Sequence, residues 1–147
     1  MSINNLTSLV HLVDDEFVIR DSLTLLLESV GQMVRSFESA EAFLNGYDPA
    51  QPGCLLLDVR MPLMTGYELQ DELLNRDINI PIIFISGHGY TDIPDSTKAL
   101  KGDAVDFLEK PFDNKTLLER INEAIKKDSV FRETLTKKRR NTRAATV

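Results

Sequence analysis

The stretch CLLLD, at residues 54–58, places a carboxylate directly after four apolar residues. A short continuous apolar run is typical of a strand that is buried on both faces of a parallel sheet. A charged group at the end of such a strand is costly to bury unless it is paired or used chemically. The stretch therefore predicts a strand whose last residue, Asp58, belongs to a functional site.

Three other apolar runs also end in polar residues. LVHLV (Leu9–Val13) is followed by Asp14 and Asp15, PIIFIS ends in Ser86, and VDFLEK ends in Lys110. The carboxyl ends of parallel strands lie together at one edge of a sheet, where open α/β folds build their sites. The sequence thus predicts one pocket that contains three acids, a hydroxyl and a lysine, which together could accept a phosphoryl group.

Segments with helical periodicity lie between these strands. Apolar spacing predicts a helix that closes at Gly31, a helix capped by Ser39 that runs through Leu44, further helices over 67–74 and 95–100, and a last helix capped by Asp113. A short strand, Met33–Phe37, completes the set. Five strands alternating with five helices predict an α/β fold with a doubly wound, five-stranded parallel sheet.

The composition is that of one globular domain, with 147 residues, 42% hydrophobic and 27% charged. The single cysteine, Cys54, is expected to be a buried thiol in a reducing compartment. No export signal precedes the first strand, and no apolar run approaches the roughly 20 residues of a membrane span, which predicts a cytoplasmic protein without membrane contact. Residues 1–127 hold 11 Lys and Arg against 21 Asp and Glu, so this part is not expected to bind nucleic acid.

Five separated motifs resemble the receiver domain of two-component response regulators. They are VDDE at 13–16, SFESAEAFL at 36–44, LLLDVRMPLMTG at 55–66, FISGHG at 84–89 and AVDFLEKPF at 104–112. The motifs are most similar to the nitrogen-fixation regulator subclass, whose members usually carry a C-terminal helix-turn-helix of the NarL/LuxR type. The resemblance implies a flavodoxin-like strand order of 2-1-3-4-5. It also implies a receiver domain over 8–127 and a basic linker over 128–147.

The resemblance assigns a role to each polar strand end. Asp58 would be the phosphoacceptor, with Lys110 and Ser86 contacting phosphoryl oxygens. Acids packed together repel one another, and a divalent cation such as Mg²⁺, or Mn²⁺, would relieve that repulsion. The metal ligands implied by the family are Asp15, Asp58 and the backbone carbonyl of Arg60, with Asp14 acting through water.

The family also implies a conformational switch. Ser86 would move toward the phosphorylated acceptor, and Phe107 would rotate into the vacated space, unless Phe107 is a permanently buried strand residue. The bond before Pro111 is usually cis in the family. Arg60 and His88 occupy positions that modulate water's access to the acyl phosphate, although His88 could equally face solvent.

Simpler roles are open for several of these residues. Asp14 could cap the first helix, and Lys110 could lie along the surface as a solvated cation. The segment after Ser86 is two residues longer than in relatives, as though Tyr90 and Thr91 were inserted. The helix expected at 95–100 would therefore start late or be short.

The C-terminal tail has a different character. Apolar residues spaced by four and three beyond Leu117 suggest a prolonged last helix, with Asp128 interrupting the apolar seam. The tail holds six basic residues against two acidic ones, and solvated linker charge is the favoured interpretation over phosphate contacts. An output domain that binds DNA is expected to lie outside this chain.

Three functional hypotheses follow. In the first, phosphoryl transfer from a sensor histidine kinase to Asp58 reshapes the surface of the fourth helix, fifth strand and fifth helix, which controls homodimerisation and transcription. In the second, a stand-alone receiver relays phosphate or binds a partner protein. The third is a haloacid-dehalogenase-like phosphatase, but its second acid, two residues after the nucleophile, is replaced by Arg60. We therefore expect a phospho-accepting switch with slow autophosphorylation and autodephosphorylation, and not an enzyme.

Overall fold

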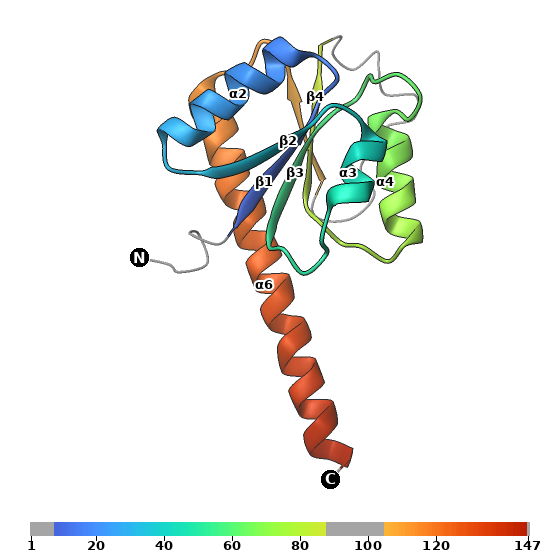
Figure 1. Cartoon of the computed structure of the whole chain (residues 1–147). Coiled ribbons are helices and arrows are strands. Elements are labelled where there is room, and N and C mark those ends of the chain that lie inside the picture. Colours follow the sequence, from blue (N-terminus) through green and yellow to red (C-terminus); the bar gives the residue numbers. More distant parts are fainter. Residues whose placement is uncertain (1–7, 88–104, 147) are drawn as a thin grey trace.

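The computed structural model describes residues 8–87 and 105–146, and its centre is a five-stranded parallel sheet (Figure 1). The strands are β1 (Leu9–Val13), β2 (Met33–Phe37), β3 (Gly53–Asp58), β4 (Ile82–Ser86) and β5 (Val105–Glu109). Their order across the sheet is β2-β1-β3-β4-β5, and every neighbouring pair is parallel. The predicted fold class and strand order are confirmed.

Within the described ranges, helices cover both faces of this sheet. They are α2 (Phe17–Ser29), α3 (Ala40–Gly46), α4 (Gly66–Asn75) and α6 (Asn114–Thr146). Helices α2 and α6 pack on one face, and α3 and α4 pack on the other (Figure 1). The helix expected at 95–100, together with Tyr90 and Thr91, lies outside the described residues.

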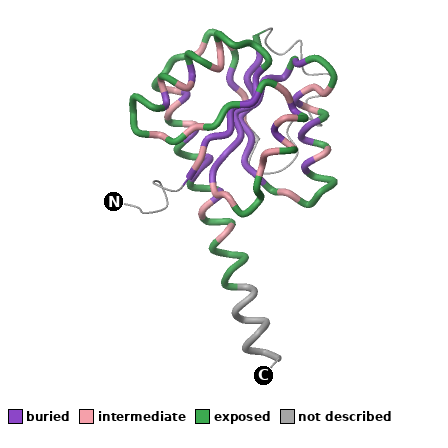
Figure 2. Tube along the Cα trace, viewed as in Figure 1, coloured by how far each residue is buried: buried purple, intermediate pink, exposed green. Residues whose placement is uncertain are grey.

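Each face of the sheet has its own apolar core, and the strands form the buried centre of the molecule (Figure 2). Leu56 of β3 packs with Ile121 on the α2 and α6 face, and Leu57 packs with Phe43 on the opposite face. Strand β3 is buried along its whole length, which explains its continuous apolar sequence. Cys54 is fully buried, as predicted.

Helices α3 and α4 each begin directly after a side chain that caps them. The Ser39 hydroxyl accepts the Ala42 N–H at 3.1 Å at the start of α3, and Thr65 and Glu68 form a reciprocal capping box at the start of α4. The predicted helix ends were less accurate, because α3 continues two residues past Leu44. Side-chain caps mark the start of a helix in sequence more clearly than its end.

Helix α6 continues without interruption well beyond the sheet on which it packs (Figure 1). Its first half buries Leu117, Ile121 and Ile125. The tail is therefore helical through Thr146, while the division into a domain and a linker at residue 128 stays a prediction. In the part of the chain that the structure describes, no helix combines the length and apolarity needed to cross a bilayer.

Candidate functional site

The carboxyl edge of the sheet brings the predicted polar strand ends together. Strands β1 and β3 are paired in register up to the residues before Asp14 and Asp58, so these two acids come level with each other. Ser86 ends the neighbouring strand β4. The Ser86 carbonyl accepts the Lys110 backbone N–H at 2.7 Å, which places the backbone of Lys110 at the same edge.

Asp14 is a buried acid with few partners. Its Oδ1 accepts the Glu16 N–H at 2.9 Å, and its Oδ2 lies 3.6 Å from Lys110 Nζ. Arg20 donates to its backbone carbonyl at 2.7 Å. Burial raises the pKa of Asp14, while the Glu16 N–H and the Lys110 charge act in the opposite direction. The N-cap of α2 is Glu16, so Asp14 does not hold the helix-capping position that was open to it from sequence.

Asp58 is 5% exposed and is the most perturbed acid of the site. Burial, followed by the negative charge of Asp14, raises the pKa of Asp58 to about 7. The Lys110 charge and a hydrogen bond from the Arg60 backbone N–H oppose this change. Two carboxylates therefore share one lysine in a site that is poorly solvated, and the excess of negative charge favours a cation there.

Lys110 is not a fully solvated surface cation, because its side chain is only 22% exposed and faces Asp14. The peptide bond between Lys110 and Pro111 is cis, as the family resemblance implied. The Lys110 ammonium lies within electrostatic reach of both buried acids.

The acids at the end of β1 fit a divalent cation. Carboxylate oxygens of Asp14, Asp15 and Glu16 lie within 4.8 Å of one another. The Oδ2 of Asp14 is buried and accepts no hydrogen bond from the described residues, and oxygen donors of this kind suit Mg²⁺. Glu16 places a third carboxylate beside the predicted Asp14 and Asp15. Metal ligation by Asp15, Asp58 and the Arg60 carbonyl, and by Asp14 through water, stays a prediction.

The loop after Asp58 returns close behind the acid. The Gly66 N–H donates to the Val59 carbonyl at 3.0 Å. A Cβ atom at Gly66 would lie 2.5 Å from the backbone oxygen of Asp58, so only glycine fits there without a shift of the backbone. The first turn of α4 therefore packs directly against the end of β3.

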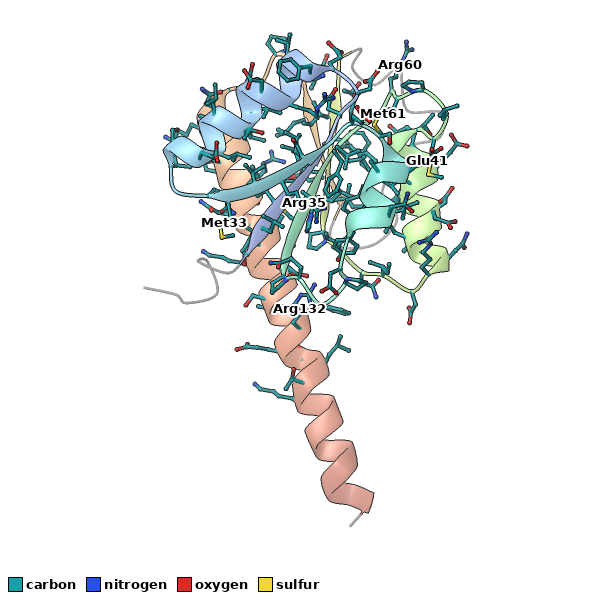
Figure 3. All side chains as sticks on the ribbon, in the orientation of Figure 1. Met33, Arg35, Glu41, Arg60, Met61 and Arg132 are labelled. Carbon is teal, nitrogen blue, oxygen red and sulfur yellow. The ribbon has the colours of Figure 1, made fainter. Side chains whose placement is uncertain are left out.

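Phe107, the proposed switch residue, is partly buried in a group of aromatic rings. Its ring stacks on Phe84 with centroids 5.1 Å apart, and its centroid is 6.3 Å from that of Tyr67. Phe107 is therefore not fully buried, and its rotation on phosphorylation stays a prediction. Arg60 is exposed at the acidic edge (Figure 3), whereas His88 lies outside the described residues.

Comparison with known proteins agrees with this geometry. Residues 10–122 match the family model of the response regulator receiver domain. Over 123 residues the chain is 46% identical to the response regulator protein TmoT of Ectopseudomonas mendocina, which covers 84% of this chain and 55% of TmoT. Over 115 residues it is 46% identical to the transcriptional regulatory protein FixJ of Rhizobium meliloti, which covers 78% of this chain and 55% of FixJ.

Among solved structures, that of the response regulator StyR superposes with a TM-score of 0.85 at 40% identity, over 91% of this chain and 67% of StyR. The chain spans about half the length of the curated relatives TmoT and FixJ. The family model covers most of the chain, and the sheet order and acidic edge agree with it. This chain belongs to the response regulator receiver domain family of two-component systems.

Proposed function

We propose that the domain accepts a phosphoryl group on Asp58 and that the aspartyl phosphate alters its surface. The observation that best supports this proposal is the environment of Asp58, which is 5% exposed and lies next to Asp14 and Lys110. A carboxylate held away from bulk water can attack a phosphoryl donor when nearby charges offset its own.

A divalent cation is part of this proposal. Receiver domains generally bind Mg²⁺ at an acidic cluster, and Asp14, Asp15 and Glu16 form such a cluster here. When bound, Mg²⁺ or Mn²⁺ offsets the charge of the acids and of phosphoryl oxygens. We assign its ligation to Asp15, Asp58 and the backbone carbonyl of Arg60, with Asp14 acting through water.

The remaining residues position and sense the phosphoryl group. The Lys110 ammonium, now 3.6 Å from Asp14 Oδ2, is close enough to turn to a phosphoryl oxygen. The Ser86 hydroxyl then donates to another oxygen, and Phe107 follows into the space behind it. Arg60 limits the approach of water to the acyl phosphate, and His88 has the same role.

In this proposal the domain is cytoplasmic, and its phosphoryl donor is the phosphohistidine of a sensor histidine kinase. The phosphorylated domain forms a homodimer through the face that includes β5 and α6, and an attached output domain binds DNA. FixJ is named a transcriptional regulatory protein, and that name supports a transcriptional output. A stand-alone receiver that relays phosphate or binds a partner protein is the second candidate.

The test is to add Mg²⁺ with acetyl phosphate and to measure intact mass and oligomeric state. We expect one phosphoryl adduct per chain and a shift from monomer to dimer, both of them absent in Asp58→Asn. Asp21→Asn, which removes an exposed acid of α2, serves as the charge-matched control and should behave as wild type. An adduct that persists in Asp58→Asn would disprove the assignment.

The same experiment separates the alternatives. An adduct without dimerisation would support the stand-alone receiver, and rapid release of phosphate over many turnovers would support the phosphatase. Arg60→Ala should change the decay rate of the adduct, and an unchanged rate would remove the proposed role of Arg60.

A further inference from the structure

Residues 130–137 of α6 are packed less tightly by apolar contacts than the first half of the helix. Val130, Phe131 and Leu135 are 62%, 41% and 38% exposed, in contrast to the buried Leu117 and Ile121. A groove of about 820 Å³ lies between this part of the helix and the segments that contain Tyr47 and Ile78, and Phe131 and Leu135 line it without closing it. Apolar contacts alone therefore do not fix the direction of the helix beyond residue 128.

Polar contacts from Arg132 join this half of α6 to the loop between α3 and β3. Its Nη2 atom donates to the Pro49 carbonyl at 3.1 Å and to the Gln51 carbonyl at 3.0 Å. Its Nη1 atom approaches the Ala50 carbonyl at 3.4 Å. One guanidinium thus reaches three consecutive backbone carbonyls, a geometry that a lysine ammonium cannot reproduce. Figure 3 shows Arg132 at the place where α6 leaves the sheet, at the end of the sheet opposite Arg60.

Asp128 orients that guanidinium and also contacts the sheet. Its Oδ2 accepts Arg132 Nε at 2.8 Å and the Gly53 N–H at 2.9 Å. The Asp128 side chain is only 2% exposed, and truncating one member of a buried charge pair leaves the other without compensation. Gly53, the first residue of β3, has φ +147°, and a Cβ there would lie 1.8 Å from the Leu9 carbonyl oxygen. The helix is therefore joined to a point of the sheet that is itself tightly constrained.

We propose that Asp128 and Arg132, together with the carbonyls of residues 49–51, form a latch that fixes the direction in which α6 leaves the domain. Closed, the latch makes the extended helix a rigid continuation of the receiver. Open, it leaves that part of the helix free to change direction, because the groove beside it offers space and little apolar contact. This inference does not depend on phosphorylation of Asp58, so it can fail or succeed separately from the proposed function.

The test measures a distance across the latch by pulsed electron paramagnetic resonance. Nitroxide labels on Met33→Cys, in β2, and Lys137→Cys, in α6, replace two exposed side chains on either side of it. Cys54 does not compete for the label, because it is fully buried and burial raises the pKa of its thiol to about 12. We expect one narrow distance distribution in the otherwise wild-type protein.

Arg132→Ala and Asp128→Asn should each broaden this distribution and cause a loss of amide hydrogen-exchange protection over residues 130–137. Thr134→Ala is the matched control, since among the described residues its hydroxyl bonds only to the Val130 carbonyl within the helix, and it should leave the distance narrow. Arg132→Gln is a second variant in case Arg132→Ala fails to fold, as judged by circular dichroism. A distribution as narrow in folded Arg132→Ala or Arg132→Gln as in wild type would overturn the proposal.

Discussion

Lowering the pH should weaken the fold through His11, a residue of β1 that takes no part in the proposed chemistry. His11 is 2% exposed, and neither ring nitrogen has a hydrogen-bond partner among the described residues. The rings of Phe37, Phe43 and Tyr47 lie around it, with centroids 5.0 to 6.4 Å away. Burial, followed by the charge of Arg35, lowers the pKa of His11 from 6.5 to about 4.

The size of the effect follows from proton linkage. Between about pH 6.5 and pH 4 the unfolded chain binds a proton at His11 and the folded chain does not, so the free energy of unfolding decreases as the pH falls through this window. A lowering of the pKa from 6.5 to about 4 corresponds to about 3 kcal/mol over the whole window, or about 2 kcal/mol between pH 7.5 and pH 5. Above pH 6.5 the contribution is constant.

The assay is urea unfolding followed by circular dichroism at several pH values, for wild type and for His11→Leu. Leucine fits an apolar site and cannot be protonated, so the stability of His11→Leu relative to wild type should rise by about 2 kcal/mol from pH 7.5 to pH 5. Asp14 and Asp58, whose raised pKa values act in the opposite direction, are present in both proteins and cancel in the difference. A difference that does not depend on pH would refute the assignment of a buried, neutral imidazole.

Two further predictions concern the segment between Asp58 and α4. Gly66→Ala should destabilise the fold by about 1 to 3 kcal/mol in urea unfolding, because its Cβ would lie 2.5 Å from the Asp58 carbonyl oxygen. Gly87→Ala is the matched control, since the nearest atom to its Cβ is 3.9 Å away, and an equal loss in both variants would contradict the steric argument. Thr65→Ala removes the capping box with Glu68 and should cost about 1 kcal/mol of unfolding free energy, whereas Thr65→Ser should retain most of it.

The strands of the sheet, and most of the polar residues at its carboxyl edge, could be predicted from the sequence. The strand runs are short, apolar and bounded by turn residues, and parallel strands place their carboxyl ends together by topology alone. Asp14, Asp58, Ser86 and Lys110 could therefore be grouped from the sequence alone, and the structure places them at one edge. Glu16 joins Asp14 and Asp15 because it directly follows them at the end of β1 and the start of α2.

The contacts at the opposite edge could not be predicted in this way. Asp128 interrupts an apolar spacing, and from sequence it indicated a weak point of the helix, whereas the structure buries it against the Gly53 amide 75 residues away. Arg132 contacts backbone carbonyls 81 to 83 residues earlier in the chain. Every residue has a backbone carbonyl, whatever its side chain. The sequence of residues 49–51 therefore gives no indication that their carbonyls accept hydrogen bonds from Arg132.

The position of β3 limits how a change at Asp58 can reach α6. Asp58 ends this strand and Gly53 begins it, so the proposed phosphoacceptor and the proposed latch lie at the two ends of one element. Strand β3 is hydrogen-bonded to β1 and to β4 and is buried throughout, so it cannot slide without breaking ladders on both sides. We therefore expect the latch to stay closed on phosphorylation and the signal to pass through β5, the edge strand, which is joined to α6 where Arg120 donates to both carboxylate oxygens of Asp106.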